Sequence, residues 1–234
     1  MSDRPLVAVV VFPGSNDDRD AAWALGSVGA EPTFVWHEET SLPGGTGAVV
    51  LPGGFSYGDY LRTGAIASVA PVMSAVREFA SVGGPVLGIC NGFQVLCEAR
   101  LLPGVLRPNR QLEFVCADAS LLVEVADSLF LRRCTIGQEL VIPVKHGEGA
   151  WYADEGTFVQ LAARGQIVLR YTADVNGAMG NVAGVVNEAG NVMGLMPHPE
   201  HAVDPLLGSA DGGLLLAALV DAAARHGALA ATTA

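Results

Sequence analysis

The first half of the chain alternates short apolar runs with segments of helical periodicity. The runs from Leu6 and from Ala48 have no polar face, which is typical of strands that are buried on both sides of a sheet. Apolar residues in the intervening segments recur at helical spacing. This strand–helix–strand order predicts a parallel sheet with right-handed crossovers. The predicted strands are Leu6 to Phe12, Pro32 to Trp36, Ala48 to Leu51 and Val86 to Ile89, and the predicted helices are one capped by Ser15 or Asn16 and ending at Gly29, and Ile66 to Ala80.

In the second half of the chain, apolar and polar residues alternate less regularly, so its helices and strands are harder to assign. A run that follows Glu188-Ala189-Gly190 pairs with the run before it in a hairpin pattern. A long apolar segment near the end predicts a closing helix. The elements expected here are two strands or a hairpin in Leu112 to Val125, two short strands in Phe158 to Tyr171, hairpin strands Ala183 to Asn187 and Val192 to Met196, and a helix from Leu214 to Ala224.

No internal repeat and no linker divides the chain. Its 234 residues suffice for one large α/β domain with a substantial core. We therefore expect residues 1 to 227 to form a single domain with an open, mainly parallel, twisted sheet and helices on both faces. The Ala- and Thr-rich residues 228 to 234 are predicted to be a disordered tail.

The net charge of −11 argues against nucleic acid or an anionic membrane as a partner. No apolar stretch is long enough to span a bilayer, and the N-terminus lacks the layout of a signal peptide, so we expect a cytoplasmic protein. The four cysteines match no Cys-x-x-Cys metal pattern and should stay reduced there. Cys97, Cys116 and Cys134 are interpreted as packing residues, and no metal site is predicted.

The fourth cysteine has a different setting. Gly88-Ile89-Cys90-Asn91-Gly92 has the form Gly-x-nucleophile-x-Gly between a strand and a helix-compatible stretch. That form suits a sharp turn, because glycine on each side removes Cβ atoms that would collide. The turn would put the Cys90 sulfur at a helix N-terminus, where the dipole favours thiolate. The alternative is an inert buried cysteine, which is the commoner fate of an intracellular thiol.

A nucleophilic cysteine needs a base, and the base needs an orienting carboxylate. The segment His198-Pro199-Glu200 offers both. Pro199 holds the preceding residue extended, and residues i and i+2 of an extended segment point to the same side. His198 and Glu200 can therefore face one another, although a polar loop after a strand would explain this pair equally well.

Taken together, Cys90-Asn91-Gly92-Phe93-Gln94 and His198-Pro199-Glu200 resemble the class I glutamine amidotransferases, a family of flavodoxin-like α/β fold. The resemblance implies a Cys90-His198-Glu200 triad that hydrolyses glutamine to glutamate and ammonia. It covers about Leu6 to Ala223. Three further segments are similar to the glutaminase subunits of phosphoribosylformylglycinamidine synthases of de novo purine synthesis. These segments are residues 51–60, 142–149 and 190–200.

The family resemblance also implies a set of substrate-binding residues. Backbone N–H groups near Gly53-Gly54 and at Asn91 would hold the oxyanion, and Gln94 would bind the amino-acid end of glutamine. The backbone of His146-Gly147-Glu148 would hold the α-carboxylate and amine. His146 is a rival to His198 for the role of base, and we rank it second. Lys145 and Ala150-Trp151 depart from the residues usual in the family.

The chain has no Gly-x-x-x-x-Gly-Lys-Ser/Thr loop, and Lys145 is its only lysine. We therefore expect no cofactor in this chain. By resemblance, ATP and Mg²⁺ are used by a large synthetase subunit that receives the ammonia, often together with a small accessory subunit. The alternatives are a glutaminase that serves a different synthetase, a stand-alone cysteine hydrolase of related fold, and a non-catalytic regulatory subunit.

Overall fold

A computed structural model describes residues 4 to 233 of the chain. Its elements in chain order are β1 (Leu6–Val11), α1 (Asp18–Ser27), β2 (Glu31–Trp36), β3 (Thr46–Leu51), η1 (Ser56–Asp59), η2 (Ala67–Val69), α2 (Val72–Ser81), β4 (Val86–Ile89), α3 (Asn91–Glu98), β5 (Val105–Arg107), β6 (Val115–Val123), β7 (Glu139–His146), β8 (Ala150–Tyr152), α4 (Glu155–Ala163), β9 (Ile167–Tyr171), η3 (Met179–Asn181), β10 (Val182–Val186), β11 (Val192–Leu195), η4 (Pro199–His201), η5 (Pro205–Leu207) and α5 (Gly212–Thr233). None of the helices in residues 4 to 233 combines the length and apolar character needed to cross a membrane.

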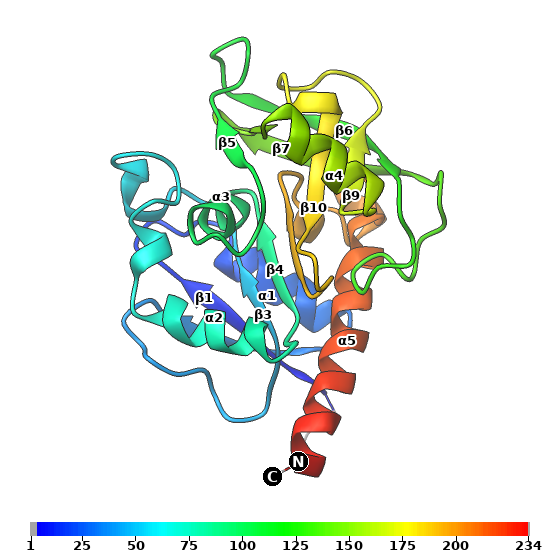
Figure 1. Cartoon of the computed structure of the whole chain (residues 1–234). Coiled ribbons are helices and arrows are strands. Elements are labelled where there is room, and N and C mark those ends of the chain that lie inside the picture. The colour runs from blue at the N-terminus through cyan, green and yellow to red at the C-terminus, as the bar shows by residue number, and fades with distance from the viewer. Residues whose placement is uncertain (1–3, 234) are drawn as a thin grey trace.

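One large sheet organises the molecule (Figure 1). Its strand order is β2-β1-β3-β4-β11-β10-β9-β6-β7, and β5 pairs with β8 in a separate small sheet. The first five strands are parallel to their neighbours, and the remaining pairs are antiparallel. The α/β fold and its parallel sheet are thus as predicted, and an antiparallel half extends it.

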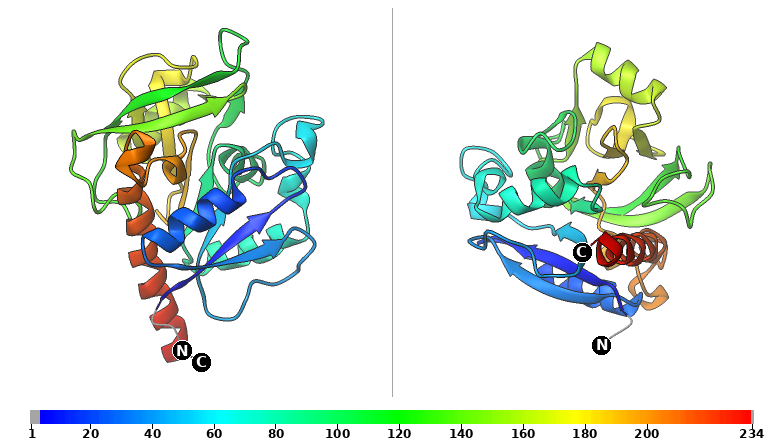
Figure 2. Two further views of the ribbon diagram at one scale, coloured as in Figure 1. Left: turned by 180° about the vertical axis from the view of Figure 1, so that it is seen from behind. Right: turned by 60° about the horizontal axis from the view of Figure 1, so that its bottom comes forward.

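Helices cover both faces of the parallel half. On one face, α1 and α5 pack against each other and against β1, and α5 also packs along β3. On the other face, α3 packs against β3, β4 and β11, and α2 lies on the same side (Figure 2). The strands β3, β4 and β11 are buried from end to end, which explains why their sequences show no polar face.

Several predicted boundaries and types were wrong. The helix expected from Ile66 begins at Val72, because Pro71 fits only the start of a helix. Helix α1 has Asp17 at its N-cap position rather than Ser15 or Asn16. Residues 112–125 hold one strand, β6, whose exposed positions hid its length. The first of the two strands expected in 158–171 is helix α4 instead.

The last helix differs from the expectation of a disordered tail. Helix α5 runs to Thr233 and so includes all but the last of residues 228 to 234. Alanine has the highest helix propensity of all residues, which allows an Ala-rich end to continue the preceding helix. The predicted hairpin, in contrast, is present: β10 and β11 pair antiparallel, with Val186 opposite Met193.

Candidate active site

Cys90 stands at the end of β4 with a backbone that L-residues rarely adopt, φ 49° and ψ −104°. It is the N-cap of α3, and its N–H donates to the carbonyl of Leu195 at the end of β11 at 2.8 Å. Gly92 makes the turn possible, because a Cβ there would lie 1.9 Å from the Leu51 carbonyl oxygen. The sharp strand-to-helix turn predicted around Cys90 is therefore present, with the thiol at a helix N-terminus.

His198 and Glu200 lie beside this turn because β11 is the parallel neighbour of β4. Both side chains are buried, and His198 Nδ1 is 2.6 Å from Glu200 Oε1. Burial alone would lower the pKa of His198, but the Glu200 carboxylate and the Cys90 sulfur outweigh it and raise that pKa to about 10. The Nε2 atom has no hydrogen-bond partner among the described residues. It is therefore available for proton transfer.

A cavity of about 370 Å³ opens over Cys90 and His198. That volume is within the range of small-molecule sites. Most of its lining follows the carboxyl ends of strands, where ligands bind in open α/β sheets. Seven predicted site residues line it: Gly54, Cys90, Gln94, His146, Gly147, Glu148 and His198. The other three are neighbours of lining residues: Gly53 precedes Gly54, Asn91 follows Cys90, and the Glu200 carboxylate contacts the His198 ring.

The two predicted sources of oxyanion N–H groups flank the nucleophile. Asn91 is the first residue of α3, and the N–H groups of a first helical turn have no partner inside the helix. Gly54 lines the cavity with φ 147° and fits closely against the loop after β1, since a Cβ there would lie 2.6 Å from Gly14 O. Gly53 supports that loop instead, because its carbonyl accepts the N–H groups of Asn16 and Asp17.

Gln94 is one helical turn beyond Cys90, and its side chain is held by the protein at both ends. Its Nε2 donates to the Glu148 carbonyl at 2.6 Å, and its Oε1 accepts from Asn91 Nδ2 at 2.8 Å. The Asn91 Oδ1 in turn accepts the N–H of Ser56 at 3.1 Å. This chain of amides ties α3 to the loops on two sides of the cavity and fixes the backbone at Glu148.

His146 lines the cavity but is engaged elsewhere. Its Nδ1 lies 3.0 Å from Asn109 Oδ1, and its Nε2 lies 3.5 Å from Asn176 Nδ2. Burial and the positive charge of His198 lower the pKa of His146 to about 4. A neutral imidazole with both nitrogens bonded is poorly placed to exchange protons with a substrate, which favours His198 as the base.

The wall of the cavity contains a pair of acidic residues, of which only Glu148 was predicted from the sequence. Asp59 joins Glu148 there, and burial together with the Glu148 charge raises the pKa of Asp59 to about 6. Thr63 Oγ1 is 3.4 Å from Glu148 Oε2. Two carboxylates suit the α-ammonium group of an amino acid. Asp59 lies within a segment of family resemblance, but nothing in its own spacing marked it as a cavity residue.

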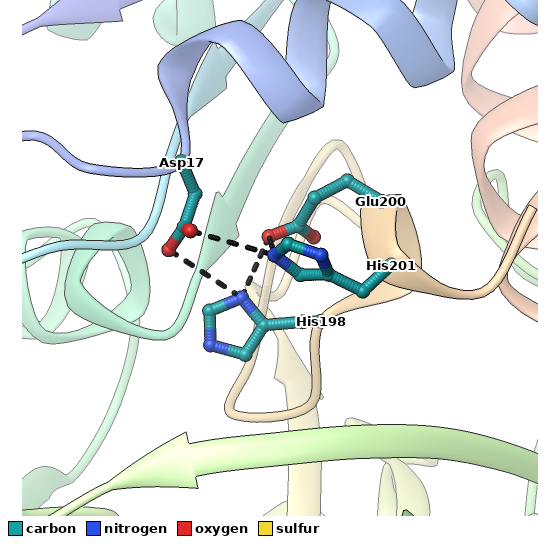
Figure 3. Close-up of side chains that lie close together, drawn as sticks. All are labelled: Asp17, His198, Glu200 and His201. Carbon is teal, nitrogen blue, oxygen red and sulfur yellow. Dashed lines mark hydrogen bonds and ion pairs between the residues drawn. The ribbon is translucent and has the colours of Figure 1, made fainter. Parts of the chain in front are cut away.

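A second group of residues, which was not predicted from the sequence, lies on the Nδ1 side of His198 (Figure 3). The Asp17 carboxylate is buried. Its Oδ2 is 3.7 Å from His198 Nδ1, and its Oδ1 is 2.5 Å from Lys145 Nζ. His201 Nε2 lies 3.0 Å from the same ammonium. Within residues 4 to 233, the side chains of Asp17, His198, Glu200 and His201 offer metal-type ligand atoms within 4.8 Å of one another. The cation that contacts this group is the Lys145 ammonium.

Comparison with known proteins shows the family to which the chain belongs. Residues 4–211 match the CobB/CobQ-like glutamine amidotransferase domain. A Rubrobacter xylanophilus protein, phosphoribosylformylglycinamidine synthase subunit PurQ, is 56% identical over 217 residues, which are 92% of this chain and 98% of that protein. The PurQ subunit of Bradyrhizobium diazoefficiens is 54% identical over 222 residues, 91% of this chain and 95% of that protein. The chain belongs to the PurQ glutamine amidotransferases.

A solved structure of PurLQS from Thermotoga maritima has the same fold as this PurQ-family chain. The two align with a TM-score of 0.86 and 42% identity over 93% of this chain and 98% of that one. PurQ is the glutaminase subunit of its synthase, and the nucleophile turn, histidine and carboxylate found here suit that activity. The departure at Trp151 is a matter of packing, because its ring is fully buried against Gly104 and its Nε1 donates to Pro103 O.

Proposed function

We propose that Cys90, His198 and Glu200 hydrolyse glutamine through a γ-glutamyl thioester. The Cys90 thiolate attacks the carboxamide carbon, and the resulting oxyanion is held by the N–H groups of Gly54 and Asn91. His198 then gives its Nε2 proton to the amide nitrogen as the C–N bond breaks and ammonia leaves. The observation that supports this best is the ring of His198, fixed by Glu200 at 2.6 Å and facing the same cavity as Cys90.

The second half of the reaction returns the enzyme to its starting state. A water molecule attacks the thioester carbon while His198 accepts its proton, and the C–S bond breaks to release glutamate and the Cys90 thiolate. Glu200 keeps the ring oriented and stabilises its protonated form without taking the proton itself. Splitting one difficult amide hydrolysis into two acyl transfers lowers the barrier of each.

The ammonia is passed to a partner in this proposal. The Thermotoga maritima structure is described as PurLQS, and the curated relatives are subunits of a synthase, which supports an assembly with a large synthetase and a small accessory subunit. The synthetase subunit uses ATP and Mg²⁺ to convert formylglycinamide ribonucleotide to the amidine. The setting is the cytoplasm, where purine synthesis takes place.

Labelling of the nucleophile tests the assignment. The electrophilic glutamine analogue 6-diazo-5-oxo-L-norleucine should modify Cys90, as mapped by mass spectrometry of peptides. Cys116→Ser is the matched control, because Cys116 is the exposed thiol of the described residues. Wild type and Cys116→Ser should both be labelled, and Cys90→Ser should not. Label at another residue, or undiminished label in Cys90→Ser, contradicts the mechanism.

Coupling to a partner is tested by glutamate release. The purified chain should hydrolyse glutamine slowly, and addition of the synthetase subunits with nucleotide and formylglycinamide ribonucleotide should stimulate it. Full activity of the isolated chain, with no stimulation on mixing, would favour a stand-alone hydrolase.

A further inference from the structure

The triad leaves one part of the site unexplained. Asp17 is a buried carboxylate on the Nδ1 side of His198, the same side as Glu200 (Figure 3). Its Oδ2 is 3.7 Å from Nδ1, so its charge acts on the ring at short range although the distance exceeds a hydrogen bond. A triad with one carboxylate does not require a second one at this position.

The approach of Asp17 to the ring is built into the backbone. The loop after β1 is held against the loop after β3, where the N–H of Asp17 donates to the Gly53 carbonyl at 3.2 Å. A Cβ at Gly53 would lie 2.5 Å from Asp17 Oδ2 and 2.7 Å from His198 Cε1. Only glycine at this position leaves room for carboxylate and imidazole to meet.

Lys145 supplies the countercharge. Its ammonium is 2.5 Å from Asp17 Oδ1 and 3.0 Å from His201 Nε2, and its own carbonyl oxygen is 3.7 Å from Cys90 Sγ. A buried carboxylate without a partner would be costly. Burial raises the pKa of Asp17, but its hydrogen bonds with His201 and Lys145 and the charges of His198 and Lys145 outweigh burial and lower that pKa to about 2. Asp17 is therefore charged near neutral pH.

We propose that Asp17, held in place by Lys145, is a second carboxylate for the imidazole of His198 and helps to keep that ring protonated in the resting site. Both are positioning residues, since they act through His198 and not on the substrate. The inference rests on the proposed function, in which a protonated His198 delivers the proton that ammonia carries away.

The titratable groups around His198 come from five segments. Cys90 lies at the start of α3, Glu200 and His201 on η4, Asp17 before α1, and Lys145 and His146 on β7. Cys116 and Asp118 on β6 line a second cavity together with His198. Burial and the charge of His198 keep His146 neutral near pH 7. Asp17 and Lys145 thus add one negative and one positive charge to those of the triad. Removing either charge alone must move the protonation of His198, and the two removals must move it in opposite directions.

The experiment is an NMR titration of His198 with ¹³C- and ¹⁵N-labelled histidine. It is done in the Cys90→Ser chain, where the thiolate no longer affects the ring and no hydrolysis is needed. Adding Asp17→Asn should lower the pKa of His198 by about one unit or more, because an opposite charge at this distance is typically worth about 1 to 3 units. Adding Lys145→Met should raise it, and the double variant should lie between the two.

Asp20→Asn is the matched control, because Asp20 is a half-exposed carboxylate near His201 that has no contact with His198. It should leave the pKa of His198 unchanged. In the active chain with its synthetase partner, the alkaline limb of the kcat/KM profile should move down in pH for Asp17→Asn and up for Lys145→Met. Shifts of both single variants in the same direction, or no shift in either, overturn the proposal.

The titration distinguishes a loss of stability in the variants from a change in the protonation of His198. A merely structural role for the pair would give similar losses of stability in both variants without opposite movements of the titration. Should Asp17→Asn fail to fold, Lys145→Met and the double variant still decide, because the proposal requires the double variant to titrate below Lys145→Met. The titration does not depend on glutamine hydrolysis, so failure of the proposed function is seen separately, in the labelling of Cys90.

Discussion

Replacement of Gly92 by alanine is the most direct test of how the nucleophile is held. The added Cβ would lie 1.9 Å from the Leu51 carbonyl oxygen, 2.6 Å from its carbonyl carbon and 2.9 Å from its Cβ. Ordinary contact begins near 3.4 Å, so the first of these distances must grow by about 1.5 Å. Because two of the three contacts are to backbone, no side-chain rotation relieves them, and α3 has to withdraw from β3.

Two effects of this withdrawal can be measured. Overpacking of a buried backbone contact should lower the free energy of unfolding by about 2 kcal/mol or more. Displacement of the α3 N-terminus moves Cys90 and the Asn91 N–H together, and a misplacement of about 1 Å costs roughly 100-fold in rate. Urea denaturation followed by circular dichroism gives the first number, and glutamate release in the presence of the synthetase gives the second.

Gly26→Ala is the control for Gly92→Ala. Gly26 lies in helix α1 with no atom within 4 Å of the added Cβ, so alanine there should leave activity unchanged and raise stability by up to about 1 kcal/mol. The reasoning is refuted if Gly92→Ala keeps more than a tenth of wild-type activity and loses less than about 0.5 kcal/mol of stability. Such a result would mean that the close contact with β3 does not hold the turn.

Three further predictions concern the reacting groups and the cavity. Cys90→Ser should abolish glutamate release and keep the circular dichroism spectrum of wild type, because serine is a poor nucleophile at this pH; turnover above a tenth of wild type contradicts this. Glu200→Gln should lose less kcat than His198→Ala, since the carboxylate orients the ring but does not transfer the proton; an active His198→Ala with an inactive His146→Ala would identify the other base. The KM for glutamine should rise as the pH falls below about 6, where Asp59 becomes neutral, and steady-state kinetics of Asp59→Asn should show a high KM without that rise; a wild-type pH dependence in this variant would rule Asp59 out.

The parallel half of the fold could be predicted because burial on both faces of the sheet makes the sequences of its strands apolar. β1, β3 and β4 are apolar at successive positions, and glycine or proline marks their ends. The single strand β6 was not predicted, because it exposes part of one face near the edge of the sheet and its sequence therefore lacks a continuous apolar run. Helix α4 was not predicted, because Leu161 is its one buried residue and the helix has no apolar stripe. A local signal of its start was nevertheless present, since the Asp154 side chain accepts the N–H of Thr157.

The proximity of Cys90, His198 and Glu200, the residues of the proposed triad, could be predicted from local motifs and from the family resemblance that these motifs carry. Each of its parts sits in a local pattern that is tied to a strand end, and strands with parallel neighbours bring their carboxyl ends together. The Asp17–Lys145 pair has no such pattern. The two residues are separated by 128 positions: Asp17 lies in the loop after β1, in the parallel half, and Lys145 lies on β7, at the edge of the antiparallel half. Only the path of β7 in three dimensions brings Lys145 to the loop after β1, and no periodicity in one dimension encodes that path.

The place of β11 in the sheet has a consequence for how activity first arises during synthesis. This strand lies between β4 and β10 in the middle of the sheet, yet it is the last strand in the chain. A chain emerging from the ribosome displays Cys90 roughly a hundred residues before His198 has been made. Until β11 inserts beside β4, the thiol has neither its base nor the carbonyl of Leu195 that receives its N–H. In the proposed mechanism, glutamine hydrolysis is therefore confined to chains that extend past Glu200, and chains that end before this residue release no ammonia from glutamine.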